Sequence, residues 1–256
     1  MRALLFFHQQ NDLWTIRDRL DAVFDKIRDK QRLDPTSQFV YAFIGSWTYG
    51  EISAHAFRCL IRRYRSWEGI ADAPTGDIET ALTGVTFSEK KAPDLQLAFL
   101  QLALRKIRAR AGSINLEFLA DHPVESALFW LEQIYSVGHK IAAATLNFST
   151  LRKRAFVVDT HVLRVMRRFG FVSPRTDEIA VFDAVMAAAA DFEADDLYEL
   201  HWYLKGLGQE TCTHFRTLCT SCPLSDMGMK RVEKGATAVT RNLAMQLRRA
   251  ETMASA

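Results

Sequence analysis

Residues 135–170 read YSVGHKIAAATLNFSTLRKRAFVVDTHVLRVMRRFG, and this stretch decides the fold expected for the chain. A short turn at YSVG leads into an apolar run whose spacing predicts a helix over residues 140–148. A second helix is predicted over residues 160–169, directly after Asp159, whose carboxylate is expected to cap it. The first of these helices begins after a glycine with unpaired backbone amides, which is typical of a site for an anion such as a phosphate.

Basic side chains are concentrated in the same region. Residues 138–170 contain seven lysines and arginines against one acid, so this window carries +6 and the rest of the chain −3, within a net charge of +3. Such a concentration can bind the phosphates of a nucleic acid, or it can be a solvated basic helix face. The charge pattern alone leaves both interpretations open.

The remainder of the chain also favours helices. Apolar residues recur at helical spacing and strand-like alternation is scarce, so we expect an all-α fold. A chain of 256 residues with 48% hydrophobic content is enough for one large domain or two small ones. Asp12 is expected to cap a first helix with an apolar stripe from Leu13 to residue 27. Further helices are expected over residues 39–47, 52–67, 77–82, 93–110, 124–134, 178–190 and 197–207.

The apolar segments of the chain are short. Residues 3–7 form an apolar run too brief for a signal peptide, and no run approaches the roughly 20 residues that span a bilayer. We therefore expect a soluble cytoplasmic protein.

Two side chains in the opening stretch can carry chemistry. Lys140 stands at the entrance of its helix with small apolar residues behind it, and apolar surroundings that lower the pKa of an amine make it a nucleophile. The alternative is that Lys140 only neutralises phosphate. Asp159 follows an apolar FVV run, which places its carboxylate at the edge of a core, although capping alone is the commoner role. A lysine and a carboxylate brought together can act as nucleophile and electrostatic partner.

The order of these motifs resembles the helix-hairpin-helix DNA glycosylases, and within them the endonuclease III branch. That family's hairpin motif, L-P-G-V-G-x-K, lies over IYSVGHK at residues 134–140, and its aspartate motif lies over VVDTHVLRV at residues 157–165. The resemblance implies that Lys140 is the catalytic lysine and Asp159 the catalytic aspartate. It also implies two helical domains that flank a DNA-binding cleft, with these two residues facing each other across it.

The resemblance divides the chain into two domains. A six-helix, barrel-like domain with the hairpin is expected over residues 36–151. Residues 1–35 and 152–256 are expected to form a discontinuous second domain, with a cysteine loop at residues 212–228 and a C-terminal extension.

An enzyme of this family rotates a damaged base out of the DNA stack. The resemblance implies that Lys140 attacks C1′ of the flipped nucleotide, expels the base and forms a Schiff base that β-eliminates. Asp159 would orient or deprotonate the amine and stabilise positive charge on the sugar. The expected partner is double-stranded DNA with a damaged base or an abasic site, bound by a monomer associated with the nucleoid. Two alternatives stay open: a glycosylase without lyase activity, in which Asp159 activates water, and a non-catalytic binder of distorted or abasic DNA.

Contacts with DNA also follow from the resemblance. Backbone contacts are expected from the hairpin and from basic residues: Ser136, Val137, Gly138, His139, Arg152, Lys153 and Arg216. The segment FVYAFIGSWTYGEIS at residues 39–53 is similar to the one that supplies wedge and pocket residues, which are Trp47, Thr48 and Tyr49 here. Trp47 can equally belong to the core. The hairpin departs from the motif, because Tyr135 replaces a proline and Ser136 replaces a glycine whose backbone can need a positive φ angle.

Three of the four cysteines lie close together, at Cys212, Cys219 and Cys222. In an intracellular protein such spacing indicates metal or cluster ligation more than disulfides. The family's [4Fe–4S] motif, C-x6-C-x2-C-x5-C, matches the three, but its fourth position is Gly228. Three interpretations stay open: a cluster with an unusual fourth ligand such as Asp226 or His214, a different metal, or a loop without metal.

Overall fold

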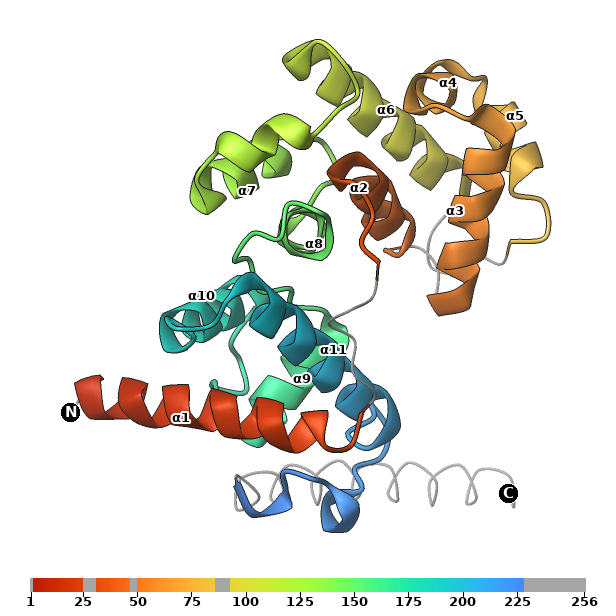
Figure 1. Ribbon diagram of the computed structural model, residues 1–256. Coiled ribbons are helices and arrows are strands. Elements are labelled where there is room, and N and C mark those ends of the chain that lie inside the picture. The colour runs from red at the N-terminus through yellow and green to blue at the C-terminus, as the bar shows by residue number, and fades with distance from the viewer. Residues whose placement is uncertain (1, 25–30, 47–49, 86–92, 228–256) are drawn as a thin grey trace, which may run out of the picture. The chain divides into compact units, whose positions relative to one another are not determined.

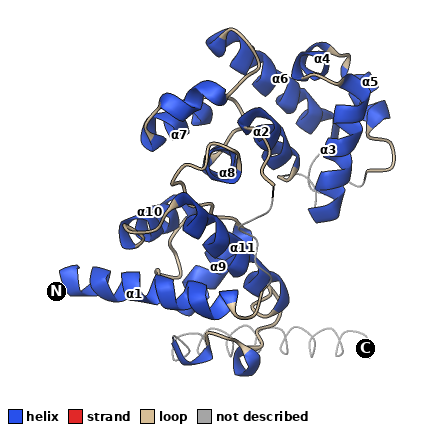
Figure 2. Ribbon diagram, viewed as in Figure 1, coloured by secondary structure: helices blue, strands red, loops and turns tan. Residues whose placement is uncertain are grey.

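The structure is a computed structural model. It describes residues 2–24, 31–46, 50–85 and 93–227, without the side chains of residues 2–11 and 93–95 (Figure 1). Every regular element within these ranges is a helix (Figure 2), and the described residues add two isolated β-bridges, Leu33 with Ser149 and Cys212 with Thr217. The expected all-α fold is confirmed. None of the described helices is both long and apolar enough to span a membrane.

The chain forms two compact units. One consists of residues 1–29 together with 158–256, and the other of residues 30–157. The domain expected over residues 36–151 lies inside the second of them. Lys140 falls in the unit of residues 30–157 and Asp159 in the other, so each is described in its own unit.

The unit of residues 30–157 contains helices α2 to α8. They are α2 (Pro35–Ile44), α3 (Gly50–Tyr64), α4 (Trp67–Asp72), α5 (Thr75–Ala81), α6 (Pro93–Ala111), α7 (Val124–Glu132) and α8 (His139–Phe148), with the 3-10 helix η1 (Glu117–Asp121) before α7. The described part of this unit thus has one α-helix more than the six expected. The helix expected over residues 52–67 ends at Tyr64, because Arg65 adopts a left-handed φ of 58° and Ser66 caps the separate helix α4.

The core of this unit includes the packing of α2 against α8, and α8 also packs against α7. Asp34 caps α2 by accepting a hydrogen bond from the backbone N–H of Ser37, and Pro35 opens the helix. Residues 141–147 of α8 are all buried. A helix that is apolar on nearly all sides lies inside a core. The start of α8 is therefore held on a rigid element.

The other unit contains α1 (Arg2–Asp21), α9 (Thr160–Phe169), α10 (Glu178–Ala188), α11 (Ala194–Glu210) and the 3-10 helix η2 (Cys219–Ser221). Helix α11 packs against α9 and α1, and α10 packs against the same two helices (Figure 1). Leu13, Ile16 and Leu20 of α1 are buried as expected, but the stripe ends earlier than predicted, because α1 stops at Asp21 and Val23 is 59% exposed. The prediction that Asp12 caps this helix is wrong, because α1 already begins at Arg2 and no glycine or proline interrupts it upstream of Asp12.

Candidate active site

The turn between α7 and α8 contains one left-handed residue. Ser136 has a φ of 65°, whereas Gly138, the N-cap of α8, is extended with a φ of −93°. The backbone N–H of Val137 donates to the carbonyl of Ile134 at 3.1 Å, and the Val137 side chain is buried. The positive φ thus falls at the position where serine replaces the glycine of the hairpin motif. A left-handed conformation costs a residue with a Cβ roughly 1–2 kcal/mol.

A substitution at this position should stabilise the hairpin. We expect Ser136→Gly to raise the free energy of unfolding by about 0.5–1 kcal/mol, because relief of the strained φ outweighs the entropy that glycine adds to the unfolded chain. Urea unfolding followed by circular dichroism measures this change. Ser113→Gly is the matched control, since Ser113 is an exposed serine of the same unit with no positive φ and should lose stability. Equal losses in both variants would contradict the prediction.

The first turn of α8 presents Lys140. Its side chain is exposed, and the next seven residues are buried behind it. No side chain caps this helix, and apart from Gly138 itself and its neighbours in the chain, nothing crowds the position that a Cβ on Gly138 would occupy. His139 Nδ1 lies 2.6 Å from Glu132 Oε1, which ties the start of α8 to the end of α7. Residues 132–138 line an open hollow, so an anion can reach the backbone amides of the turn.

The two basic residues after α8 differ in their surroundings. Lys153 Nζ donates to the carbonyls of Ala120 and His122, at 2.8 and 2.7 Å, and so closes the end of η1. Arg152 has a φ of 45° and an exposed side chain. Both DNA contacts stay predictions, and the one expected from Lys153 would use the third donor of an ammonium that already holds two carbonyls.

Asp159 caps α9, as the sequence predicted. Its Oδ1 atom accepts hydrogen bonds from the backbone N–H groups of His161 and Val162, each at 2.8 Å. Its Oδ2 atom lies 3.9 Å from Nζ of Lys205 on α11. Asp159 is only 7% exposed, so the cap is also a nearly buried carboxylate beside a cation.

The surroundings of Asp159 favour its ionised form. Burial is the largest influence and raises its pKa, but the positive charge of His201 and the hydrogen bond from the Val162 amide lower it. The charges of Lys205 and His161 lower it further, and the resulting pKa of Asp159 lies below its ordinary value. Asp159 is therefore an anion at neutral pH.

Close packing of α11 on α9 sets this geometry. A Cβ on Gly208 would lie 3.0 Å from Cβ of His161, and 3.3 Å from Cγ2 of Val165. Arg164 Nη2 donates to the carbonyl of Gly208 at 2.6 Å and lies 3.0 Å from Nδ1 of His161. Glycine thus allows α11 to approach the end of α9 at which Asp159 stands.

Sequence reasoning missed Lys205. The available signal was a lysine inside the run LHWYLKGL, where an interior, mostly apolar helix has little reason to carry a charge. Its relation to Asp159 depends on the packing of two helices that are far apart in sequence.

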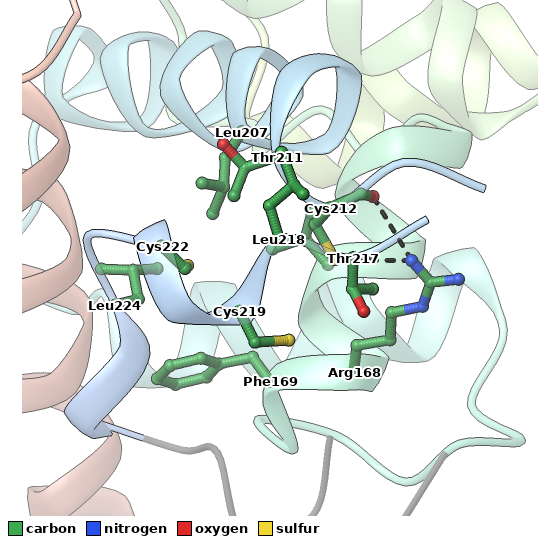
Figure 3. A pocket seen from close by; sticks show the side chains of 11 residues that line it. Arg168, Phe169, Leu207, Thr211, Cys212, Thr217, Leu218, Cys219, Cys222 and Leu224 are labelled. Carbon is green, nitrogen blue, oxygen red and sulfur yellow. Dashed lines mark hydrogen bonds between the residues drawn. The ribbon is translucent and has the colours of Figure 1, made fainter. Parts of the chain in front are cut away.

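The three clustered thiols line one cavity of about 40 Å³ (Figure 3). Phe169 of α9 and Leu207 of α11 contribute to its walls, and none of the three cysteines is in a disulfide. Burial raises the pKa of the Cys222 thiol, and the neighbouring Cys212 and Cys219 raise it further.

Two arginines of α9 hold this loop. Arg168 Nη1 donates to the carbonyl of Thr213 at 2.5 Å and contacts both the carbonyl and Sγ of Cys212, at 3.4 and 3.5 Å (Figure 3). Arg168 Nη2 donates to the carbonyl of His214 at 3.2 Å, and Arg164 Nε donates to the carbonyl of Cys212 at 3.0 Å. Both arginines were counted in the basic window of the sequence, and here they bind the protein's own backbone.

Within the part of the chain that the structure describes, the loop shows no fourth ligand for a cluster beside its three thiols. The carboxylate of Asp226 pairs with Arg19 of α1, whose Nη2 lies 3.0 Å from Oδ2, and this hydrogen bond lowers the pKa of Asp226. His214 is exposed, with its ring against that of Phe215. Gly228 lies outside the described residues. Within residues 2–24, 31–46, 50–85 and 93–227, no three His, Cys, Asp or Glu side chains are arranged to hold a metal ion.

Several expected contacts are not tested. Trp47, Thr48 and Tyr49 lie outside the described residues. Arg216 is exposed, as a residue that contacts DNA must be, and its contact stays a prediction. The same holds for the approach of Lys140 to Asp159, which belong to different units.

Comparison with known families adds a decisive observation. The sequence model described as HhH-GPD superfamily base excision DNA repair protein matches residues 47–188. The chain belongs to the HhH-GPD superfamily. The matched range includes both Lys140 and Asp159, so the two candidate catalytic residues lie within the part that defines the superfamily.

Relatives of this HhH-GPD protein include bacterial and plant proteins. Endonuclease III of Treponema pallidum (strain Nichols) is 33% identical over 126 residues, which are 49% of this chain and 56% of the relative. DNA glycosylase/AP lyase ROS1 of Arabidopsis thaliana is 26% identical over 172 residues, which are 62% of this chain and 12% of that protein. The chain therefore matches about half the length of the bacterial relative and a small part of the plant one.

A solved structure shares the fold of this HhH-GPD chain. The structure of a trapped endonuclease III–DNA covalent intermediate, an estranged-adenine complex, has a TM-score of 0.66 and 19% sequence identity. The match covers 87% of this chain and 98% of that one. The expected endonuclease III type of helical fold is confirmed.

Proposed function

We propose that the chain is a base-excision-repair DNA glycosylase with an associated AP lyase activity, which cleaves DNA at abasic sites through a Schiff base on Lys140. The observation that carries the proposal is the α7–α8 hairpin, which places Lys140 in the first turn of a helix that no side chain caps and whose next seven residues are buried. The relatives support it, since one is named a DNA glycosylase/AP lyase and a similar fold was trapped covalently on DNA.

The chemistry needs a neutral amine and an anion. The Lys140 amine attacks C1′ of the flipped nucleotide, the bond from C1′ to the base breaks, and the base leaves with the electron pair and takes up a proton. The sugar opens to a Schiff base, loss of the C2′ proton then breaks the C3′–O bond, and water releases the enzyme. The Asp159 anion accepts the amine's proton or opposes the positive charge that develops on the sugar.

The exposure of Lys140 favours a second candidate. Lysines become good nucleophiles in apolar surroundings, and the side chain of Lys140 is exposed whereas Asp159 is buried and ionised. A glycosylase without lyase activity would use the Asp159 carboxylate to activate a water molecule. Such an enzyme releases a base and leaves the strand intact.

Borohydride trapping on duplex DNA with one abasic site tests the proposal. Borohydride reduces a Schiff base to a stable amine, so we expect a covalent complex of one protein and one DNA strand, and a nicked strand without borohydride. Release of a damaged base without trapping would establish the second candidate. Binding to the abasic duplex without any product would indicate the non-catalytic binder.

For the cysteine loop, the arginine bonds favour a loop that keeps its fold without a [4Fe–4S] cluster. We expect purified protein to contain far fewer than the roughly four irons of such a cluster, and its melting temperature to be unchanged by a chelator. Arg168→Ala should lower the free energy of unfolding by about 1–3 kcal/mol, because the carbonyls of Thr213 and His214 lose this donor.

The matched control for Arg168 is Arg175→Ala, because Arg175 is an exposed arginine of the same unit. Iron content, visible absorbance and thermal melting are measured for the wild type, Arg168→Ala and Arg175→Ala. A full complement of iron, with loss of structure on chelation, would show that a cluster holds the loop.

A further inference from the structure

Lys205 lies on the face of α11 that packs against the start of α9. Its Nζ atom is 4.5 Å from the ring centroid of Trp202, one turn earlier on the same helix, and 3.9 Å from Oδ2 of Asp159. The Lys205 side chain is 28% exposed and that of Asp159 is 9% exposed. The ammonium is therefore held between an aromatic face and a nearly buried carboxylate.

The two oxygens of Asp159 have different partners. Oδ1 accepts the two backbone N–H groups at the head of α9 and so serves the helix cap. Oδ2 faces the ammonium of Lys205. Substitution of Lys205 can therefore change the environment of one oxygen and leave the hydrogen bonds of the other in place.

Other charged and titratable groups also surround the carboxylate. Helix α9 contributes His161 and Arg164, and α11 contributes His201 in addition to Lys205. Arg164 is bonded to the carbonyls of Gly208 and Cys212. Burial lowers the pKa of His161, and Asp159 opposes this effect without cancelling it.

We propose that Lys205 is a positioning residue for Asp159, which fixes the orientation of Oδ2 and supplies an opposite charge that helps a buried carboxylate remain an anion. The inference rests on the proposed function, in which that anion faces the developing positive charge. A buried carboxylate without a partner is costly, and in addition to the two amide bonds at Oδ1 and the influence of His201, Lys205 places a cation within ion-pair distance of Oδ2. The ring of Trp202 restricts the lysine by a cation–π contact.

Burial also lowers the pKa of Lys205. The negative charge of Asp159 raises it, but the pKa stays below its ordinary value. A lysine of this kind can itself be a nucleophile, which is a different role from positioning. The experiment therefore separates an amine that acts through Asp159 from an amine that attacks the sugar.

Lys205→Met removes the charge and keeps the apolar stem, and Lys205→Arg keeps the charge. The first measurement uses free protein: an NMR titration of the Asp159 carboxyl carbon. Because Lys205 lowers the pKa of Asp159, its loss should raise that pKa, and arginine should restore much of the difference. Lys106→Met, which changes an exposed lysine of α6, should have no effect on it.

The second measurement is the rate of abasic-strand cleavage under single-turnover conditions, as a function of pH. We expect Lys205→Met to be about 10–100-fold slower at neutral pH. As the pH is lowered, the cleavage rate of Lys205→Met should begin to fall at a higher pH than the rate of the wild type, because its Asp159 carboxylate becomes protonated at a higher pH. In the Asp159→Asn background, Lys205→Met should have little further effect, since its action passes through the carboxylate.

The outcomes distinguish this inference from the proposed function. An Asp159 pKa unchanged in Lys205→Met overturns the inference, whatever the activity. A raised pKa in a protein that cleaves no DNA upholds positioning and removes the proposed function. Trapping that persists in Lys140→Ala and disappears in both Lys205 variants would make Lys205 the nucleophile and overturn its positioning role.

Discussion

Lys140→Ala is expected to abolish the borohydride-trapped complex and to slow strand cleavage at an abasic site by at least about a thousandfold. The substitution removes the only amine that the proposed mechanism uses. Alanine is a good helix former, and position 140 is exposed, so α8 should keep its fold. Trapping gels and single-turnover cleavage assays measure the loss of activity, and circular dichroism measures whether the fold is kept.

Two variants control for charge. Lys140→Arg keeps a cation at the start of α8 and should bind the abasic duplex while forming no Schiff base, because the guanidinium is not a nucleophile at neutral pH. Lys106→Ala removes an exposed lysine of α6 and should trap DNA as the wild type does. If Lys140→Ala still gave the wild-type yield of adduct, another amine would carry the reaction.

Asp159→Asn is expected to slow base release by about a hundredfold to ten-thousandfold with little loss of fold. Asparagine caps helices about as well as aspartate, and its oxygen can accept the same bonds from His161 and Val162. What is lost is the negative charge beside Lys205, which in the proposed mechanism opposes the positive charge on the sugar. Base release and abasic-strand cleavage should both slow, which single-turnover assays can follow separately.

A comparison of the wild type with Asp159→Asn also tests the pKa of Asp159. A carboxylate whose folded pKa is depressed adds stability above its unfolded pKa of about 3.9, and this contribution disappears as the pH falls through the folded value. The wild type should therefore be more stable than Asp159→Asn near neutral pH, and the difference should shrink below about pH 4. A difference that grew on acidification would contradict a lowered pKa.

The local features of the site were predictable from the sequence. Helix α9 spans Thr160–Phe169 and is capped by Asp159, both as expected, because a carboxylate before an apolar-periodic run is a short-range signal. The strained turn at Ser136 could also be anticipated, since a serine stands where the motif has a glycine. Both inferences concern residues that are neighbours in the chain.

Long-range features were not predictable. The basic window counted Arg164 and Arg168 as charges, but composition does not say where a side chain points, and both donate to carbonyls of the cysteine loop. Lys205 was overlooked because its partner lies on another helix. Arg65 follows α3 in a left-handed conformation that arginine rarely adopts, so the residue type at this position did not predict the end of the helix.

The close approach at Gly208 has a consequence for mutational screens. A Cβ there would lie 3.0 Å from Cβ of His161, whose backbone N–H donates to Asp159, so the first turn of α9 would have to shift by a few tenths of an ångström and the carboxylate with it. A library scored by DNA cleavage should therefore show reduced activity at position 208, although glycine has no side chain that can take part in a reaction. Functional maps of this protein will place an apparent hot spot at a residue that acts through His161 and the Asp159 cap, and only a structural readout will tell it from the catalytic ones.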